Sequence, residues 1–446
     1  MVVSIRSRYY NLGILTMKIL ITNTVVLNAG DAAILKGVIK LLQNAFGKNT
    51  KFIMYDSQPE IARKYYPDLE FRQLIYWQGV KSSVIKRPSR VIHFLNRQRL
   101  QLGFWFWERS LLSVAKGILT REEAETLLEY HSADLIVSTG GTYLVENYSL
   151  VPRILDYKIS LNLKKDLVFF TQSLGPFHLL NNQRVFKEIF DQAALVLLRD
   201  SRSEKHLLEI GVKPEKLYLA PDAAFALGDL ASVIQSQQAS KYPVKPRIAI
   251  SVREWGHFKT VDSALGQEKY LKGIRDLTIH LVEAHQAEIT FLSTCQGIPE
   301  YHLDDSKVAL EVFDKLPQHV AKFVSVNRDF HSPEDLATLL RTYDLAIATR
   351  LHMAILSLGT GVPVFPIAYE FKTKELFEKL GQGQWVVDIE EIESQKLVNL
   401  VDQFLDSLPE VCQALFPAVQ KEIEAVFESS TLTKLTYEEI KKLVLD

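Results

Sequence analysis

The sequence is poor in cysteine and has almost no net charge. Its two cysteines, Cys295 and Cys412, lie far apart and form no CxxC pair, so neither a disulfide framework nor a zinc site is expected, as is usual in a reducing cytoplasm. Lys and Arg number 52 against 53 Asp and Glu, which gives no overall basic field for nucleic acid. We therefore expect a cytoplasmic protein without a nucleic-acid partner, in which any anion-binding site is local.

Long hydrophobic runs and common cofactor motifs are also missing. No apolar run reaches the ~18 residues of a membrane-spanning helix, and the NLGILT stretch near the start is too weak for a secretory signal. The first predicted strand is not followed by GxGxxG, and GxxxxGK[ST] does not occur, so a nicotinamide cofactor or a P-loop nucleotide is not supported. Since no His, Asp and Glu cluster has metal-ligand spacing, we predict no metal and no cofactor.

What the chain does contain is an alternation of short, β-rich apolar runs with segments of helical periodicity. Of its 446 residues 47% are apolar and 24% charged, a composition that supports folded cores in two domains. Continuous apolar strands separated by helices predict two Rossmann-like, doubly wound α/β domains with parallel sheets. The predicted parts are an N-terminal extension at 1–16, a first domain at 17–230, a linker at 231–246, a second domain at 247–390, and C-terminal helices at 391–446.

Residues 76–119 interrupt the alternation of the first domain. This insertion holds eight Lys or Arg, one Glu and the cluster FWFW. One interpretation is that its aromatic side chains pack on the first domain while the basic residues form a solvated face. The other is that basic and aromatic residues together contact a membrane surface or an anionic glycan.

Ligands of doubly wound sheets bind beyond the carboxyl ends of the strands, so the residues that follow each apolar run are candidate site residues. Glycines there let backbone N–H groups approach a ligand, and a following helix N-terminus favours anions, although Gly and Asn also mark ordinary turns. The candidates are Asn28, Gly30 and Asp31 after the first run, Gly140, Gly141 and Thr142 after the third, and Gln172, Ser173, Gly175 and Pro176 after the fourth.

Arginine follows three separate strands, at Arg199, Arg253 and Arg350. Its planar guanidinium suits carboxylate or phosphate, and it is rarely buried without an anionic partner. The alternative is a structural salt bridge, with Asp200, Glu254 and Asp222 as the nearby acids. His352 adds a group that can exchange protons near neutral pH, and Lys372 follows the next strand. Such a set predicts a substrate with more than one anionic group.

Several motifs in this order resemble the polysaccharide pyruvyl transferase family. They are NAGDAAI, GGTYL, TQSLGP, LRDSRS, PDAAF, SVR and RLHMAILSLGTGVP, followed by YEFKTKELFEKLG, and together they extend from residue 17 to about residue 390. The resemblance implies a GT-B-like fold, with two Rossmann-like domains facing across a cleft. It also implies that phosphoenolpyruvate gives its carboxyvinyl unit to two hydroxyls of a sugar, forming a cyclic ketal and releasing phosphate.

The resemblance also suggests roles for individual residues. His352 matches the family's catalytic histidine and is the candidate general acid. Arg350, Arg199 and Lys372 match positions expected to hold the phosphate or carboxylate of the donor, and Arg253 is added to them. Asp31 or Asp222 could accept the hydroxyl proton, although Asp31 could equally cap the helix that follows it.

Two other functions remain open at this stage. A GT-B glycosyltransferase that uses a nucleotide-diphosphate sugar needs the same fold and an acid for the ribose hydroxyls, and Glu370 is suitably placed for that. A non-catalytic, glycan-binding subunit of a polysaccharide-assembly complex is the third candidate, against which the Arg, His and Lys residues argue. The expected partners are phosphoenolpyruvate and a sugar or lipid-linked glycan. A peripheral contact with the inner face of the membrane through 76–119 and a homo-oligomeric state remain open.

Overall fold

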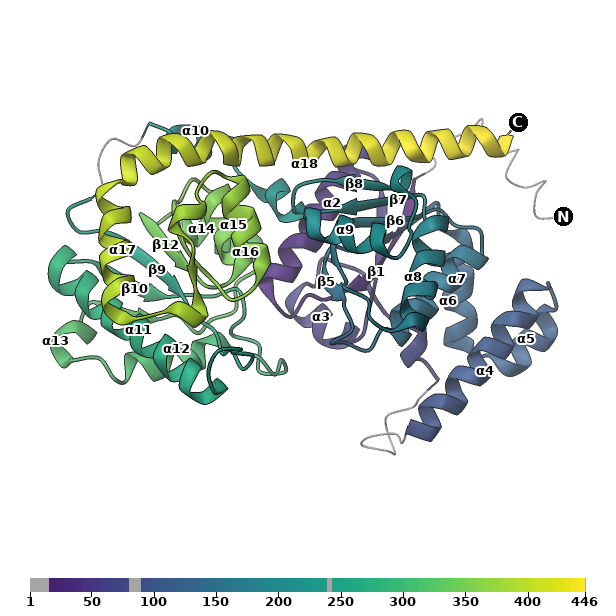
Figure 1. The fold of residues 1–446 in the computed structure, drawn as a ribbon. Helices are drawn as coiled ribbons and strands as arrows, with labels where there is room; N and C mark the ends of the chain where they lie inside the picture. The colour runs from purple at the N-terminus through teal and green to yellow at the C-terminus, as the bar shows by residue number, and fades with distance from the viewer. Residues whose placement is uncertain (1–15, 80–89, 239–242, 446) are drawn as a thin grey trace. The chain divides into compact units, whose positions relative to one another are not determined.

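The computed structural model describes residues 16–79, 90–238 and 243–445. The chain forms two compact α/β units (Figure 1). Unit 1 comprises the described residues up to Thr24, Leu41–Leu219 and those from Ser429 onward. Unit 2 comprises Val25–Lys40 and Ala220–Glu428.

This division differs from the predicted boundaries, which placed the two domains one after the other. Two long helices cause the difference, because α2 (Ala29–Phe46) and α18 (Leu408–Leu445) each have residues in both units. The predicted linker at 231–246 is also wrong in part, since α10 (Leu230–Ser236) lies there with Val233 buried. Residues 1–15 of the predicted extension and 239–242 of the predicted linker lie outside the described residues.

Unit 1 is built on a parallel sheet whose central strands are continuous apolar runs, as the sequence predicted. Every residue of β4 (Leu135–Ser138), β6 (Leu167–Leu174) and β7 (Leu195–Leu198) is buried, which requires helices on both faces of the sheet. The strand order is β3 (Phe71–Gln73), β2 (Lys51–Asp56), β1 (Lys18–Thr24), β4 (Leu135–Ser138), β6 (Leu167–Leu174), β7 (Leu195–Leu198) and β8 (Leu217–Leu219), with β5 (Gly141–Leu144) beside β6. The remaining helices of unit 1 outside the insertion are α3 (Pro59–Tyr65), α6 (Arg121–Ser132), α7 (Val151–Asn162), α8 (Leu180–Gln192) and α9 (Ser201–Glu209).

Unit 2 repeats this architecture with a second parallel sheet. Its strand order is β11 (Val324–Val326), β10 (Glu288–Phe291), β9 (Arg247–Ser251), β12 (Leu345–Ala348), β13 (Val364–Ala368) and β14 (Val387–Asp388). Its further helices are α11 (Ser263–His285), α12 (Asp305–Phe313), α13 (Gln318–Ala321), α14 (Pro333–Leu340), α15 (Leu351–Gly359), α16 (Phe371–Lys379) and α17 (Ser394–Asp406). The two sheets confirm the predicted doubly wound α/β fold.

In both sheets the strand order reverses beside the first strand. β1 lies between β2 and β4, and β9 lies between β10 and β12. At such a reversal the loops leave neighbouring strands in opposite directions, so an open crevice forms at the carboxyl ends of the strands. In unit 2 the two strands at the reversal are β9 and β12, and the predicted site residues Arg253 and Arg350 each follow two residues after one of them ends.

The insertion forms α4 (Arg90–Glu108) and α5 (Leu112–Ile118), which pack against each other. Its aromatic cluster is divided between the two faces of α4: Phe104 and Trp107 are buried, whereas Trp105 is exposed. The helix is fixed to unit 1 by Arg99, whose guanidinium lies 2.5 Å from Oε1 of the fully buried Glu123. The interpretation that the aromatic side chains of 76–119 pack on the first domain therefore holds for one face of α4. Residues 80–89 of the insertion lie outside the described part of the chain.

A buried carboxyl group joins three elements of unit 1. Asp156 on α7 accepts hydrogen bonds from the hydroxyls of Thr22 on β1 and Tyr130 on α6. Burial raises the pKa of Asp156 to about 6, although these two hydrogen bonds act in the opposite direction. Because the folded protein holds this proton more tightly than the unfolded chain does, the contribution of Asp156 to stability falls as the pH rises from about 4 to above 6.

We predict that Asp156→Asn removes this pH-dependent loss. The parent protein should lose up to about 3 kcal/mol more of its free energy of unfolding than the variant does when the pH is raised from 4 to 7. Chemical denaturation monitored at both pH values measures the difference. The exposed Glu122→Gln on α6 is the control and should show no comparable change; an equal pH dependence in both variants would contradict the assignment.

Candidate active site

The clearest candidate site surrounds the start of α15 in unit 2. β12 ends at Ala348, Arg350 is the N-cap of α15, and His352 lies in its first turn. The Ser251 hydroxyl at the end of β9 accepts hydrogen bonds from the N–H groups of Thr349 (3.0 Å) and Arg350 (3.2 Å). These bonds join the ends of two neighbouring strands, so the first turn of α15 begins at a fixed position beside the strand-order reversal.

Arg350 forms a buried, two-pronged ion pair with Asp305 at the start of α12. Its Nε lies 2.8 Å from Oδ2 of Asp305 and its Nη2 lies 2.6 Å from Oδ1, while Ser293 also donates to the carboxylate. Burial alone would lower the pKa of Arg350, but the charge and hydrogen bonds of Asp305 outweigh it and raise that pKa. Arg350 therefore forms a structural salt bridge, which was the alternative interpretation, but its partner is Asp305 and not one of the acids named from the sequence.

His352 packs against the beginning of α2. A Cβ placed on Gly30 would lie 2.7 Å from Cβ and 2.9 Å from Nδ1 of His352, so only glycine leaves room for the imidazole. Nε2 of His352 lies 3.5 Å from Oδ2 of Asp222. It is buried and makes no hydrogen bond with any residue that the structure describes. The Nε2 atom of His352 is therefore placed to exchange a proton with a bound molecule, with the Asp222 carboxylate beside it.

Asn28 and Asp222 are both held by backbone N–H groups near His352. The side chain of Asn28 accepts from the N–H of Gly30 (2.9 Å), so Asn28, and not Asp31, caps α2. Asp31 lies in the first turn of the helix. Asp222 accepts from the N–H of Ala224 (2.9 Å) and thereby caps a short 3₁₀ helix. The Asp222 carboxylate is thus oriented by the backbone as well as by its position beside His352.

A second group of site residues follows β9 and β13. The guanidinium of Arg253 lies 3.9 Å from the ring centre of Tyr369 and 5.0 Å from that of Trp255. Stacking on two aromatic rings holds the cation in place without neutralising it. The indole N–H of Trp255 is buried and has no acceptor among the described residues. An anion placed here could bind a stacked guanidinium and an unpaired donor.

Lys372 and Glu370 begin α16 and form an ion pair. Nζ of Lys372 lies 2.7 Å from Oε2 of Glu370, and the Lys372 side chain is only 14% exposed. The sequence placed Lys372 near a donor anion and Glu370 near a ribose. In the structure Glu370 is already engaged by Lys372, which reduces its availability for ribose hydroxyls.

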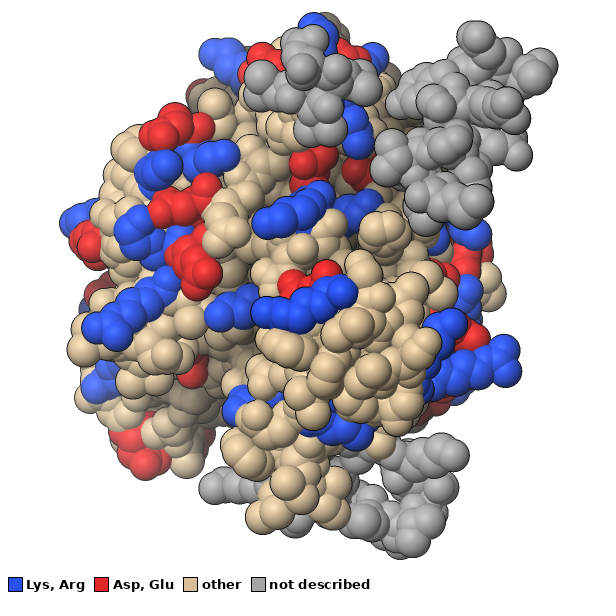
Figure 2. Space-filling model, turned by 90° about the vertical axis from the view of Figure 1, so that its right-hand side faces the viewer, with Lys and Arg blue, Asp and Glu red and all other residues tan. Residues whose placement is uncertain are grey.

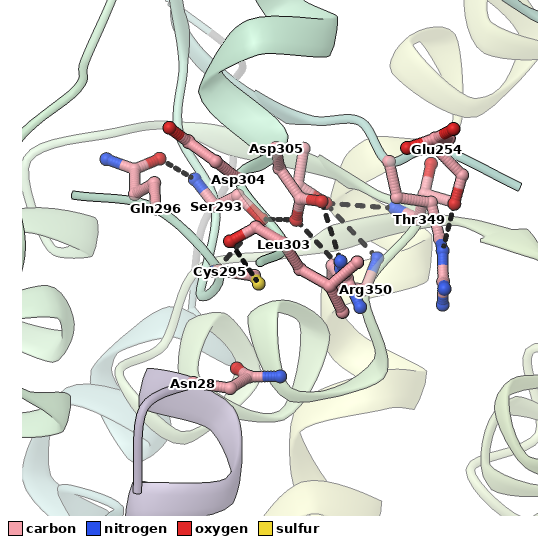
Figure 3. A network of polar contacts seen from close by, with 12 residues as sticks. Asn28, Glu254, Ser293, Cys295, Gln296, Leu303, Asp304, Asp305, Thr349 and Arg350 are labelled. Carbon is pink, nitrogen blue, oxygen red and sulfur yellow. Dashed lines mark hydrogen bonds and ion pairs between the residues drawn. The ribbon is translucent and has the colours of Figure 1, made fainter. Parts of the chain in front are cut away.

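The loop after β10 supplies site residues that the sequence analysis missed. Figure 3 shows Ser293, Cys295 and Gln296 close to Asp305 and Arg350. Burial raises the pKa of the Cys295 thiol to about 12, so the thiol stays protonated and is no nucleophile. The polar run STCQ, which follows the apolar run ITFL, was the available signal, because it lies at the same sheet edge as Arg253 and Arg350.

The other predicted site residues lie in unit 1, at the carboxyl ends of its strands. Nε of Arg199 donates to the Ser173 hydroxyl (2.7 Å), and Nη2 donates to the Thr142 hydroxyl (2.8 Å). Gln172 donates to the Thr139 carbonyl and to the Ser138 hydroxyl. The buried Gly140 precedes Gly141, which has a positive φ of 129° that favours glycine. The predicted residues thus form two groups, one in each unit.

One trio of metal-type ligands, His280, His285 and Asp402, occurs among the described residues, at the opposite end of the unit 2 strands from this site. Nε2 of His280 lies 2.9 Å from Oδ1 of Asp402, and Nε2 of His285 lies 2.8 Å from the same oxygen. Both histidines lie in the last turns of α11. Because this helix leads into β10, the trio lies at the amino ends of the strands. Its hydrogen bonds join α11 to α17, and it has no part in the site described above.

Comparisons with known proteins agree with this architecture. The chain is 26% identical over 425 residues to the amylovoran biosynthesis protein AmsJ of Erwinia amylovora, covering 91% of this chain and 96% of the relative. Among solved structures it resembles Anabaena HepE in complex with UDP-glucose, with a TM-score of 0.54, 13% identity and coverage of 96% and 100%. It also resembles UDP-GlcNAc 2-epimerase from Neisseria meningitidis, with a TM-score of 0.55, 10% identity and coverage of 95% and 100%.

The two structural likenesses establish the fold class alone, which is the GT-B-like fold expected from the sequence. The strand-end motifs that carry the family resemblance lie at the carboxyl ends of the two sheets, as a ligand site in this fold requires. The sequence model for polysaccharide pyruvyl transferases matches residues 28–370, which include all the predicted site residues except Lys372, and the chain belongs to that family.

Proposed function

We propose that this protein transfers the pyruvyl unit of phosphoenolpyruvate to two hydroxyls of a sugar in an exopolysaccharide, forming a cyclic ketal and releasing phosphate. The observation that carries the proposal is the environment of His352, whose buried Nε2 lies beside Asp222 and makes no hydrogen bond with a described residue. Family membership and the similarity to a protein named for amylovoran biosynthesis support a polysaccharide as the acceptor.

In the proposed reaction His352 acts as the general acid. The imidazolium gives its proton to C3 of phosphoenolpyruvate, while a sugar hydroxyl forms a bond to C2. The bond between C2 and the phosphate oxygen then breaks as the second hydroxyl forms its own bond to C2. Of the two hydroxyl protons lost, one replaces the proton that His352 gave and the other leaves with phosphate. Asp222 lies 3.5 Å from Nε2 of His352 and is the carboxylate proposed to receive a hydroxyl proton; Asp31 is the other candidate.

The donor carries a carboxylate and a phosphate, and the cations are assigned to these groups. Arg253 offers a stacked guanidinium next to the unpaired N–H of Trp255. Arg350 is oriented by Asp305 through Nε and Nη2, so we assign it a positioning role in addition to any contact through its remaining donors. Lys372 is proposed as a further ligand of the donor, and the role of Arg199 in unit 1 stays a prediction from the sequence. Cationic groups at the leaving phosphate lower the cost of breaking its bond.

A nucleotide-sugar glycosyltransferase is the competing enzyme of the same fold class. The acid that would bind ribose in that enzyme, Glu370, forms an ion pair with Lys372. A non-catalytic glycan-binding subunit would have no need of a half-buried histidine whose Nε2 lies beside an acid and makes no hydrogen bond with a described residue. Incubation with an exopolysaccharide fragment and either phosphoenolpyruvate or UDP-glucose decides between them. We expect phosphate release only with phosphoenolpyruvate; consumption of UDP-glucose would favour the glycosyltransferase, and no reaction with either would favour the subunit.

We predict that His352→Gln lowers kcat for phosphate release by about 10²-fold or more while phosphoenolpyruvate still binds. The amide keeps a polar group in the pocket but cannot act as a proton donor of suitable strength. Phosphate release measures the first effect and calorimetric titration with phosphoenolpyruvate the second. His319→Gln, at an exposed ion pair with Glu283, is the matched control and should leave both unchanged. Turnover by His352→Gln near that of the control would refute the general-acid role.

We also predict that Gly30→Ala impairs turnover far more than it weakens the fold. The added methyl group must displace His352, because it would lie within 3 Å of both Cβ and Nδ1. A fall in kcat of about tenfold or more is expected for a displacement of this size. Thermal unfolding should show only a small loss, because the preference of a helix for alanine over glycine, about 1 kcal/mol, offsets part of the overpacking cost of about 1–3 kcal/mol.

Gly117→Ala in α5 is the control for this substitution, because nothing lies within 4 Å of the added Cβ. Gly117→Ala makes the same change from glycine to alanine within a helix, but it lies outside the candidate active site. If Gly30→Ala and Gly117→Ala had equal turnover, the close packing of His352 on α2 would have no catalytic role.

A further inference from the structure

The outer face of α4 is an exposed apolar stripe. Its members are Val91, Phe94, Leu95, Leu102 and Trp105, with exposed fractions of 64%, 52%, 59%, 51% and 44%. They follow one another at intervals of three, four and seven residues, apart from the adjacent pair at 94 and 95, so they share one side of the helix. We call this set the outer stripe.

The opposite side of α4 already packs within unit 1. Leu100, Phe104 and Trp107 are at most 8% exposed. Gly103 on this side allows a close approach of the chain that follows α5, since a Cβ there would lie 2.5 Å from Cδ2 of Leu119. α4 therefore has two apolar faces, of which only one is used in the fold, and no described residue covers the outer stripe. Contiguous apolar side chains exposed on one face of a helix commonly mark a binding surface.

α5 extends the apolar surface. Leu111, Leu112 and Val114 are 47%, 45% and 45% exposed. They follow directly after α4 in the chain, and α5 packs against α4. The two helices lie together at one end of unit 1 (Figure 1), so that they can approach a flat surface without bringing the unit 1 sheet into it.

The charges around the stripe are almost all positive. Residues 90–118 contain five Lys or Arg and one Glu; Arg99 is paired with the buried Glu123, which leaves four cations against one acid. Arg109 stacks over Trp105, with its guanidinium carbon 3.8 Å from the ring centre, and Arg97 lies 5.7 Å from the ring centre of Phe94. Figure 2 shows the side of the molecule on which these helices lie, where broad areas without charge are bordered by Lys and Arg. Aromatic rings with cations beside them are typical of helices at a membrane interface.

We propose that α4 and α5 bind the surface of a bilayer that contains anionic lipid. The outer stripe enters the boundary between headgroups and acyl chains, while Arg97, Arg109 and Lys116 contact the lipid phosphates. An anionic glycan would provide no apolar phase for Val, Leu and Phe side chains. A second copy of the same surface would bring like charges together. Among the described residues no helix combines the length and apolar character that spanning a bilayer requires, so the contact is a peripheral one.

The test compares binding to vesicles of phosphatidylcholine alone with binding to vesicles of phosphatidylcholine mixed with phosphatidylglycerol, measured by co-sedimentation. We expect the full chain to bind the mixed vesicles and to be released by salt, because the electrostatic part of the interaction is screened. Leu95→Ser combined with Leu102→Ser should lower the partition coefficient by about tenfold or more. Both residues lie outside the candidate active site, so phosphate release with a soluble acceptor should be unchanged.

Leu179→Ser combined with Leu180→Ser is the matched control. These leucines are 61% and 70% exposed on unit 1 but lie outside the insertion, so vesicle binding should not change. Equal loss in both double variants, equal binding to both kinds of vesicle, or no binding at all would overturn the proposal. Dimerisation that is abolished by Leu95→Ser and Leu102→Ser, measured by sedimentation velocity without lipid, would assign the stripe to a second copy instead.

Discussion

The ion pair between Arg350 and Asp305 is the interaction on which the unit 2 site depends. It joins the start of α15 to the start of α12, and Ser293 extends it to the loop after β10. Both charged side chains are at most 10% exposed, so removing either partner would leave the other as an uncompensated buried charge. The arginine is therefore part of the framework that fixes the first turn of α15, and that turn carries His352.

Much of the fold could be predicted because parallel strands in a doubly wound sheet are continuous apolar runs. The central strands β6 and β12 are such runs, and every one of their residues is buried. The short edge strands β3, β8 and β14 were not predicted, because two or three residues carry too little pattern. The discontinuous units could not be predicted either, since a helix that serves both units has the same periodicity throughout.

The candidate site was only partly predictable from the sequence, because some of its key contacts join distant residues. The sequence placed Arg350 and His352 at a strand end, which follows from the apolar run before them. It could not supply Asp305, whose partner is 45 residues away in the chain. Gly30 was selected as a residue that lets a ligand approach the backbone; in the structure it admits the imidazole of His352 instead. Local sequence thus identified the loops, and tertiary packing decided their contacts.

The burial of both cysteines has a practical consequence for work on this protein. Burial raises the pKa of Cys295 to about 12 and that of Cys412 to about 11, so both thiols stay protonated near neutral pH. Maleimides and disulfide-forming probes react with exposed thiolates, which neither residue supplies. A single cysteine introduced on the surface would accordingly be the preferred attachment point for a dye or spin label, with no need to replace either natural thiol.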